Sequence, residues 1–569
     1  MHLSFCLRCA FLLATLPTAA AAVAIIPAPV EVRENGGPGF VAGIETRLVW
    51  CQPPADMDPV AVALGDLLRP LLGQRAVGWP GETTATNAII VDFNAAHESV
   101  EFKKLTSPEA YELVVTPERI VIHARTAHGA FNGVQTLRQL LPAEIERSPR
   151  PGDPAWQVPA VTVRDQPELQ WRGLMLDCGR YYFTPGAIKK LLDLMALQKL
   201  NVFHWHLTED QGWRIEIKKY PRLTSVGAWR AESPMRGDRR RGDRTRYGGF
   251  YTHEEIRDIV NYAAARFITI VPEVEMPGHS SAAIAAYPEF GNNDVPGFAP
   301  EVQTRWGVKP YTYAPKEETF AFLEDVLREV MDLFPGRYIH IGGDEAPKTQ
   351  WKNSAFAQDY MRRHGLKSED ELQSHFVGRI AKFLTANGRT LIGWDEIQEG
   401  GTPAGAAVML WRTSENWTSL GPKPAPEWKH AMAPLKAGHE IVVAPKSHFY
   451  LDYYQVDPRE SAEPEAIGGL TTLADAYAFD YLVPGLTAEE QGRIVGLHGA
   501  IWAEHIWDFP KVEYMAFPRS CALAEVAWSA KERRDFADFQ RRLEVFQRRL
   551  DELGVNYRKA GTIPRQTIQ

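Results

Sequence analysis

The sequence contains few cysteines for its length. Five occur in 569 residues, and two of them, Cys6 and Cys9, lie near the N-terminus. The other three, Cys51, Cys178 and Cys521, are an odd number and lie far apart. This distribution excludes a disulfide framework and a cysteine-based metal cluster.

Long hydrophobic runs are absent beyond the N-terminus. Residues 1–24 place His2 and Arg8 ahead of a short apolar run and end in the small-residue pattern AVA at 22–24. This order is typical of a secretory signal peptide, and the run is too short to span a bilayer. We therefore expect an exported protein, periplasmic or secreted, whose mature form starts near Ile25 and has no membrane anchor.

Neither sign of charge dominates. Lys and Arg number 63 and Asp and Glu 71, for a net charge of −8, which gives no reason to expect a nucleic-acid partner. The basic segment Arg236–Arg246 (RGDRRRGDRTR) is interpreted as a solvated loop rather than an anion site. Sixteen tryptophans are a high count, and flat indole faces suit sugar rings as well as protein cores.

The pattern of the chain changes near residue 167. Residues 25–167 contain β-rich runs such as AIIVDF and a helically spaced segment at 127–141, which predicts a small α+β accessory domain. Residues 531–569 carry apolar side chains at spacings of three and four. They predict a helical tail that packs on the preceding domain, with the seam of a homodimer as the alternative.

Residues 168–530 alternate short apolar strands with polar loops and amphipathic helices. The expected strands are 173–178, 201–206, 267–273, 338–343, 390–394, 406–411, 440–445 and 496–502. Between the first two, Thr184 is the expected cap of a helix that starts at Pro185. Eight such units predict an α/β fold, a (β/α)8 TIM barrel, with catalytic residues at the C-terminal ends of its strands.

Polar and aromatic residues do follow every predicted strand. They are Asp177 and Arg180; His204, His206, Glu209 and Asp210; Glu273, Glu275 and His279; Asp344 and Glu345; Trp394; Trp411; Tyr450 and Asp452; and Trp502 and Glu504. Packing alone does not explain polar groups at all eight ends, so a functional site is expected there.

Two chemistries suit this set. In metal-assisted hydrolysis, His204 and His206 would resemble the His-x-His pair of amidohydrolase-type barrels, with His279 and Asp344 as further ligands. That pair normally lies on the first strand, however, and here it lies on the second. Glycoside hydrolysis instead needs a proton donor and stabilisation of a sugar cation, and it accounts for the aromatic residues.

The segment YIHIGGDE places Asp344 and Glu345 side by side after two glycines. Neighbouring Cα atoms lie about 3.8 Å apart, whereas an ordinary retaining pair flanks the scissile bond from opposite sides. Adjacent acids fit a reaction in which a 2-acetamido group of the substrate is the nucleophile. Asp344 would then hold its N–H, and Glu345 would be the general acid and later the base.

Several motifs together resemble glycoside hydrolase family 20, the β-N-acetylhexosaminidases. They are WRGLMLDCGRYY, NVFHWHLTEDQGWR, VPEVEMPGH, YIHIGGDE and GWDEI, and the segments IIPAPVEV and YELVVTPERIVIHARTAHGAFNGVQTLRQLLP resemble that family's accessory domain. The resemblance implies roles for particular residues. Asp344 and Glu345 would be catalytic, Glu209 and His279 would form an acid–histidine relay, Arg180, Asp452 and Glu504 would hold sugar hydroxyls, Tyr450 would bind the acetamido oxygen, and Trp394, Trp411 and Trp502 would line the pocket.

The activity implied by this resemblance is that of an exo-acting, retaining enzyme without a cofactor. It would remove terminal β-linked N-acetylglucosamine or N-acetylgalactosamine from oligosaccharides or glycoconjugates through an oxazolinium intermediate. Glu209 and Glu275 depart from the family, in which aspartate is common at both places, and the additional methylene of glutamate displaces each carboxylate. A metal-dependent amidohydrolase-like barrel and a non-catalytic amino-sugar-binding barrel stay open as alternatives.

Overall fold

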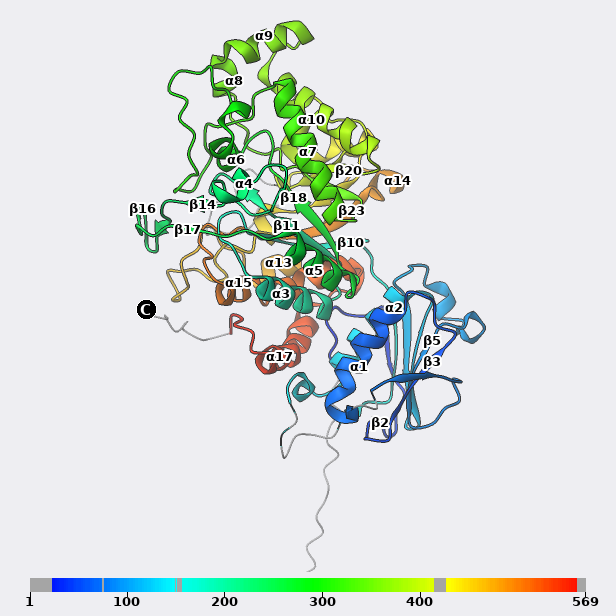
Figure 1. Ribbon diagram of the computed structural model, residues 1–569. Helices are drawn as coiled ribbons and strands as arrows, with labels where there is room; N and C mark the ends of the chain where they lie inside the picture. The colour runs from blue at the N-terminus through cyan, green and yellow to red at the C-terminus, as the bar shows by residue number, and fades with distance from the viewer. Residues whose placement is uncertain (1–22, 74–75, 149, 151–155, 414–425, 560–569) are drawn as a thin grey trace, which may run out of the picture.

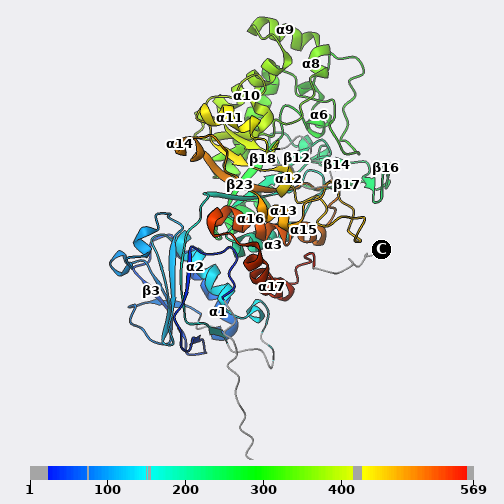
Figure 2. The same ribbon diagram turned by 180° about the vertical axis from the view of Figure 1, so that it is seen from behind.

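The computed structural model describes residues 23–73, 76–148, 150, 156–413 and 426–559 (Figure 1). Nearly all of the predicted signal peptide lies outside these residues. Within the described ranges, no helix combines the length and the apolar character needed to cross a bilayer. The chain forms a smaller N-terminal domain and a barrel, which lie side by side in both views (Figures 1 and 2).

The N-terminal domain is a seven-stranded mixed sheet with two long helices on one face. The strand order is β1 (Glu31–Glu34), β9 (Val161–Asp165), β6 (Tyr111–Val115), β7 (Arg119–Ala124), β5 (Ala88–Asp92), β3 (Arg47–Cys51) and β4 (Gly78–Pro80). The helices α1 (Asp58–Leu72) and α2 (Ala127–Leu140) lie between this sheet and the barrel. A short pair, β2 (Phe40–Val41) and β8 (Gln157–Val158), completes the domain.

The second domain is a closed barrel of parallel strands. In barrel order they are β10 (Trp171–Asp177), β11 (Val202–His206), β18 (Thr269–Glu273), β19 (Tyr338–His340), β20 (Thr390–Trp394), β21 (Ala407–Leu410), β22 (Ile441–Val443) and β23 (Ile494–Ile501). Each predicted strand overlaps one of these, in the predicted order. The prediction of a TIM barrel with a smaller N-terminal domain is confirmed.

Helices surround the barrel strands and occupy the loops between them. They are α3 (Pro185–Leu197), α4 (Arg222–Ser225), α5 (His253–Ala264), α6 (Ser281–Ala286), α7 (Glu317–Leu333), α8 (Thr349–Asn353), α9 (Ala355–His364), α10 (Glu369–Ala386), α11 (Lys429–Lys436), α12 (Lys446–Phe449), α13 (Leu473–Ala478), α14 (Ala488–Gln491), α15 (Phe509–Ala516) and α16 (Arg519–Trp528). The hydroxyl of Thr184 accepts a hydrogen bond from the Ala187 backbone at 3.3 Å, so it caps α3 as predicted.

The long loop after β11 carries three small antiparallel pairs. They are β12 (Thr208–Glu209) with β13 (Gly212–Trp213), β14 (Trp229–Arg230) with β17 (Tyr247–Gly248), and β15 (Pro234–Met235) with β16 (Asp238–Gly242). The basic segment of the sequence therefore forms a hairpin around β16. We call residues 234–242 the arginine hairpin.

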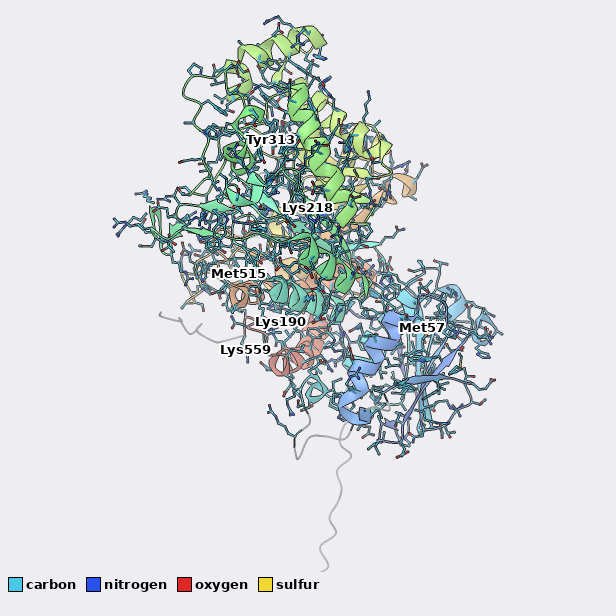
Figure 3. The ribbon with its side chains drawn as sticks, viewed as in Figure 1. Met57, Lys190, Lys218, Tyr313, Met515 and Lys559 are labelled. Atoms are coloured by element: carbon cyan, nitrogen blue, oxygen red, sulfur yellow. The ribbon has the colours of Figure 1, made fainter. Side chains whose placement is uncertain are left out.

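The C-terminal helix α17 (Phe536–Glu552) contacts both domains. Arg549 pairs with Glu146 of the N-terminal domain at 2.5 Å, and Arg542 pairs with Glu525 of α16 at 2.6 Å. Lys190 of α3, which is labelled in Figure 3, donates a hydrogen bond to the backbone oxygen of Gly554 just beyond the helix. The apolar face of α17 is buried within the chain and does not form an open dimer seam; it consists of Phe539, Leu543, Phe546 and Leu550.

Candidate active site

His279 links two pairs of acids at the C-terminal end of the barrel. Its Nδ1 lies 2.8 Å from Oε1 of Glu209 and 3.3 Å from Oδ2 of Asp210. Its Nε2 lies 3.6 Å from Oδ2 of Asp344 and 3.7 Å from Oε2 of Glu345. One imidazole therefore connects the acids after β11 with those after β19. Glu209 has one methylene more than aspartate, and its carboxylate lies within hydrogen-bond distance of the histidine.

The backbone near the acid pair is sterically constrained. Gly342 has φ +65°, and a Cβ added there would lie 1.7 Å from Oε2 of Glu275, so the position requires glycine. Glu345 and His279 also adopt positive φ values, 46° and 44°. Such values are uncommon for long side chains and persist where the surrounding structure holds them. The chain is thus folded so that the Glu345 and His279 side chains lie near each other.

The two neighbouring acids lie in different environments. The Asp344 side chain is 13% exposed, and burial raises its pKa to about 7. The Glu345 side chain is 45% exposed, and its interaction with His279 holds its pKa below the usual value. Although burial disfavours a charged imidazole, Glu209 and Asp210 raise the pKa of His279 well above its ordinary value. Over a range of pH the pair therefore holds one proton, which these pKa values place on Asp344 in the free protein.

Arg180 connects the acids after β10 and β11 with Glu504 after β23. Its Nη1 lies 3.3 Å from Asp177 and 3.3 Å from Glu209, and its Nη2 lies 3.8 Å from Glu504. Burial raises the pKa of Glu504 and that of nearby Asp452. One buried carboxylate oxygen of Asp452 and one of Glu504 have no hydrogen-bond partner among the described residues. These oxygens are available to a polar ligand.

Aromatic rings from the last four strand ends lie close together beside Arg180. The ring centroids of Trp394 and Trp502 are 5.6 Å apart, and Trp502 lies 6.1 Å from Tyr450. Trp411 and Tyr450 are nearly parallel, with an interplanar angle of 16°. Arg180 lies 5.2 Å from the Trp502 ring, so the aromatic and ionic groups form one continuous site. Each residue predicted for the site has a contact or a charge interaction with another of them. These residues are Glu345, Asp344, His279, Glu209, Arg180, Trp394, Trp411, Tyr450, Asp452, Trp502 and Glu504.

Three further residues contact the tryptophans of the site, and the sequence alone indicates no role for them. Glu273 accepts a hydrogen bond from Trp394 Nε1 at 2.7 Å, and Glu396 accepts one from Trp411 Nε1 at 2.8 Å. Lys446 lies 4.5 Å from the Trp411 ring. The signal for Glu396 was its place in GWDEI directly after a strand, whereas Lys446 follows β22 with no pattern that marks it.

The metal-ligand set considered from the sequence is not assembled. Nε2 of His204 lies 3.0 Å from Glu273, whereas His206 lies 3.2 Å from Asp177, 3.3 Å from Glu275 and 3.7 Å from Glu273. Among the residues that the structure describes, no cluster of close ligand atoms contains both histidines. A site built on the His-x-His pair with His279 and Asp344 therefore lacks support in the geometry.

Two family descriptions match the chain. "Glycosyl hydrolase family 20, catalytic domain" matches residues 169–531, and "Glycosyl hydrolase family 20, domain 2" matches residues 22–166. These ranges correspond to the barrel and to the smaller N-terminal domain.

Similar proteins carry related names. A β-hexosaminidase of Porphyromonas gingivalis is 42% identical over 537 residues, which cover 94% of this chain and 64% of that protein, so the chain spans less than two thirds of that relative. The structure of a β-N-acetylhexosaminidase from Streptomyces coelicolor A3(2) matches with a TM-score of 0.77 and 30% identity, over 95% of this chain and 98% of that one. The structure of an exo β-N-acetylglucosaminidase from Vibrio harveyi, in complex with N-acetylglucosamine, matches with a TM-score of 0.77 and 30% identity. The match covers 95% of this chain and 78% of that one.

Proposed function

The chain belongs to glycosyl hydrolase family 20, and from this premise we propose that it is an exo-acting β-N-acetylhexosaminidase. Its substrates are oligosaccharides or glycoconjugates that end in β-linked N-acetylglucosamine or N-acetylgalactosamine. The names of its relatives support the activity, and the acid pair, the relay and the aromatic wall support the reaction that follows.

The first step cleaves the glycosidic bond with a nucleophile from the substrate. Asp344 accepts the acetamido N–H, which directs the acetamido oxygen toward C1 of the sugar. Glu345 gives its proton to the leaving oxygen as the C1–O bond breaks, and the acetamido oxygen forms a new bond to C1. The product is an oxazolinium ion whose positive charge lies beside the Asp344 carboxylate.

The second step returns the enzyme to its starting state. Glu345, now ionised, takes a proton from water, and the hydroxide oxygen bonds to C1 as the acetamido oxygen leaves. Two displacements at C1 retain the β configuration. Because Glu345 is the more exposed of the two acids, it suits the position where the leaving group departs and water enters.

The exo mode follows from the closed end of the pocket. Arg180, Asp452 and Glu504 are buried or largely buried, and they offer polar atoms to the hydroxyls of a terminal sugar. A sugar extended at that edge by a further residue would have to displace these groups. The relative from Vibrio harveyi, named as an exo enzyme, is consistent with this interpretation.

One observation carries the mechanism: Asp344 and Glu345 both approach the same nitrogen of His279, within 3.7 Å. Both acids therefore approach the substrate from one side. We expect the wild type to release the aryl group of an aryl N-acetyl-β-glucosaminide. Glu345→Gln should turn this substrate over roughly a hundred to ten thousand times more slowly, as expected when a general acid is lost. The loss should grow as the pKa of the leaving group rises, because poorer leaving groups need the proton more.

A change in the substrate tests the nucleophile. Fluorination of the N-acetyl group makes its oxygen less nucleophilic, so kcat should fall with each added fluorine, while an aryl β-glucoside without the acetamido group should resist cleavage. Equal rates for the glucoside, or a trapped ester between Glu345 and the sugar, would refute the mechanism. Binding of N-acetylglucosamine with no turnover of any aryl glycoside would favour the non-catalytic alternative.

We also propose that the protein is exported, on the evidence of residues 1–24 alone. N-terminal sequencing of the protein purified from its native cells should find a mature chain that begins near Ile25. An intact residue 1 in the purified protein would contradict export by this signal.

A further inference from the structure

His279 and the acid pair have the side chains and the spacing of a transition-metal site. Nε2 of His279 lies 3.6 Å from Oδ2 of Asp344 and 3.7 Å from Oε2 of Glu345, and one ligand atom of each residue lies within 4.8 Å of the other two. Two atoms bound to one tetrahedral Zn²⁺ at its usual bond lengths of about 2.1 Å are roughly 3.4 Å apart. The three side chains therefore lie close to the positions of zinc ligands.

The hydrogen-bond partners of His279 also suit a metal. Its Nδ1 lies 2.8 Å from Oε1 of Glu209, and a carboxylate at this distance accepts a hydrogen bond, so Nδ1 carries a hydrogen. Nε2 of the same ring is buried and has no hydrogen-bond partner among the described residues. Histidines that bind metals typically donate their other ring N–H to a carboxylate, which fixes the orientation of the ring. Glu209 is such a carboxylate.

The charge around His279 favours a divalent cation. Four carboxyl groups lie within 3.7 Å of its two ring nitrogens, and they belong to Glu209, Asp210, Asp344 and Glu345. Arg180, which contacts Glu209 at 3.3 Å, offsets only part of this charge. A cation at Nε2 takes the place of protons on the imidazole and on the acid pair, and these protons pass to the solvent.

The cluster of His279, Asp344 and Glu345 is accessible to an ion. The side chains of the two acids are 13% and 45% exposed. Within the part of the chain that the structure describes, the other groups of histidines and acids with close ligand atoms consist of buried residues only. An ion can therefore reach Nε2 of His279 from the side on which the proposed substrate binds.

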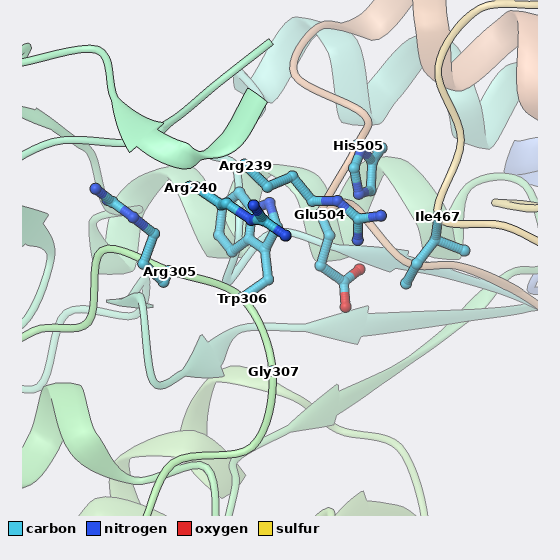
Figure 4. A pocket seen from close by; sticks show the side chains of 8 residues that line it. All are labelled: Arg239, Arg240, Arg305, Trp306, Gly307, Ile467, Glu504 and His505. Carbon is cyan, nitrogen blue, oxygen red and sulfur yellow. The ribbon is translucent and has the colours of Figure 1, made fainter. Parts of the chain in front are cut away.

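A neighbouring cavity is less suited to a cation. Glu504 and His505 line this cavity, which has a volume of about 590 Å³, and they offer a carboxylate and an imidazole (Figure 4). Nε2 of His505 has no hydrogen-bond partner among the described residues. However, the same cavity is lined by Arg239, Arg240 and Arg305, whose guanidinium groups repel a cation (Figure 4). His505 therefore provides a matched control for His279.

We propose that His279, Asp344 and Glu345 form an inhibitory site for Zn²⁺, an inference that rests on the function proposed above. The ion binds Nε2 of His279 and one oxygen of each acid, and water completes its coordination. With Zn²⁺ bound, Asp344 no longer accepts the acetamido N–H, and Glu345 has no proton to donate. The ion and the substrate therefore compete for the same side chains.

The first test measures zinc binding by calorimetry, with zinc chloride and protein freed of metal by a chelator. One ion should bind per chain, and N-acetylglucosamine should weaken its binding. Glu345→Gln should weaken binding roughly tenfold or more, because an amide replaces a carboxylate ligand, and Glu209→Gln by about ten- to a hundredfold, because the histidine loses its support. A wild-type crystal soaked in zinc chloride should show anomalous scattering at Nε2 of His279.

The second test measures how Zn²⁺ affects the cleavage of an aryl N-acetyl-β-glucosaminide. The apparent KM should double when the free zinc concentration equals the Kd from calorimetry, kcat should stay constant, and excess chelator should reverse the effect. Mg²⁺ at the same concentration should have no effect, because it prefers octahedral oxygen ligands. His505→Gln should respond to Zn²⁺ as the wild type does.

Three results would overturn the inference while the proposed function stands. They are zinc binding that Glu345→Gln leaves unchanged, a fall in kcat at saturating substrate with no change in KM, and loss of inhibition in His505→Gln. A chelator-treated wild type that does not cleave the glycoside would refute the proposed function itself. Recovery of its activity on addition of Zn²⁺ would favour the metal-dependent alternative and contradict an inhibitory site.

Discussion

At the scale of single residues, the proton shared by Asp344 and Glu345 determines the pH dependence. The proposed reaction needs one proton on the pair, because Glu345 must donate while Asp344 stays ionised. Burial gives Asp344 a pKa of about 7, whereas the interaction with His279 keeps the pKa of Glu345 below its usual value. Between these two limits the pair holds one proton, and in the free protein that proton lies on Asp344. The proposed reaction therefore needs the acetamido N–H of the bound sugar to stabilise ionised Asp344, so that Glu345 carries the proton.

We predict that kcat/KM falls as the pH rises through about 7, because the pair then loses its last proton. In Asp344→Asn the residual activity should fall at lower pH, since the remaining carboxyl group, that of Glu345, keeps its contact with His279. The measurement is a pH profile of kcat/KM at constant ionic strength. A descending limb at the same pH in both proteins would assign it to another group.

At the scale of elements, the turn after β19 positions the acid pair. Nδ1 of His340 lies 3.0 Å from the backbone nitrogen of Gly342 and 2.8 Å from Oε1 of Glu273, and this same oxygen accepts a hydrogen bond from Trp394. The turn and Trp394 are therefore packed around the same buried carboxylate, that of Glu273. Glu275 fills the space where a side chain at position 342 would stand.

Gly342→Ala should lower kcat/KM by about a hundredfold, because displacement of the acids by about 1 Å has effects of that size. Gly378→Ala is the matched control: it lies within α10, no atom lies within 4 Å of an added Cβ, and alanine should stabilise the helix by about 0.5–1 kcal/mol. Steady-state kinetics and thermal unfolding of both variants provide the test. Full activity in Gly342→Ala would show that the turn tolerates a side chain.

At the scale of the whole molecule, α17 joins the two domains through buried ion pairs. Arg542 binds Glu525, whose side chain is fully buried, and also donates to the backbone oxygen of Ile25 at 2.8 Å. A buried carboxylate left without its partner is costly. The N-terminal segment, the barrel and the C-terminal helix are therefore coupled at this point.

Arg542→Ala should lower the free energy of unfolding by about 3 kcal/mol, because it leaves Glu525 charged and buried. Its neighbour Arg541 pairs with Asp538, and both of these side chains are 45% exposed, so Arg541→Ala should cost less than about 1 kcal/mol. Urea unfolding followed by tryptophan fluorescence compares the two. Similar losses in both variants would contradict a special role for the buried pair.

The sequence by itself determined the barrel and the location of its site. Alternation of apolar strands with helices is a local pattern, and parallel closure brings all strand ends to one rim, so residues such as Arg180, Asp344 and Trp502 were predictable as neighbours. Asp344 and Glu345 are consecutive in the chain, so they lie close together whatever the fold. The same local rules identified the cap at Thr184 and the buried face of α17.

Only the tertiary structure decided how distant side chains share partners. His204 and His206 are both buried histidines of β11, yet His204 lies closest to Glu273, whereas His206 lies closer to Asp177 and Glu275 than to Glu273. Among the described residues, no cluster of close ligand atoms contains both histidines. The arginine hairpin resembles any solvated loop until Glu465 and His505 fix it beside Glu504. The burial of a side chain and the charges around it depend on residues that are far away in the sequence. Because burial and neighbouring charges set pKa values and shape pockets, a local sequence pattern does not predict them.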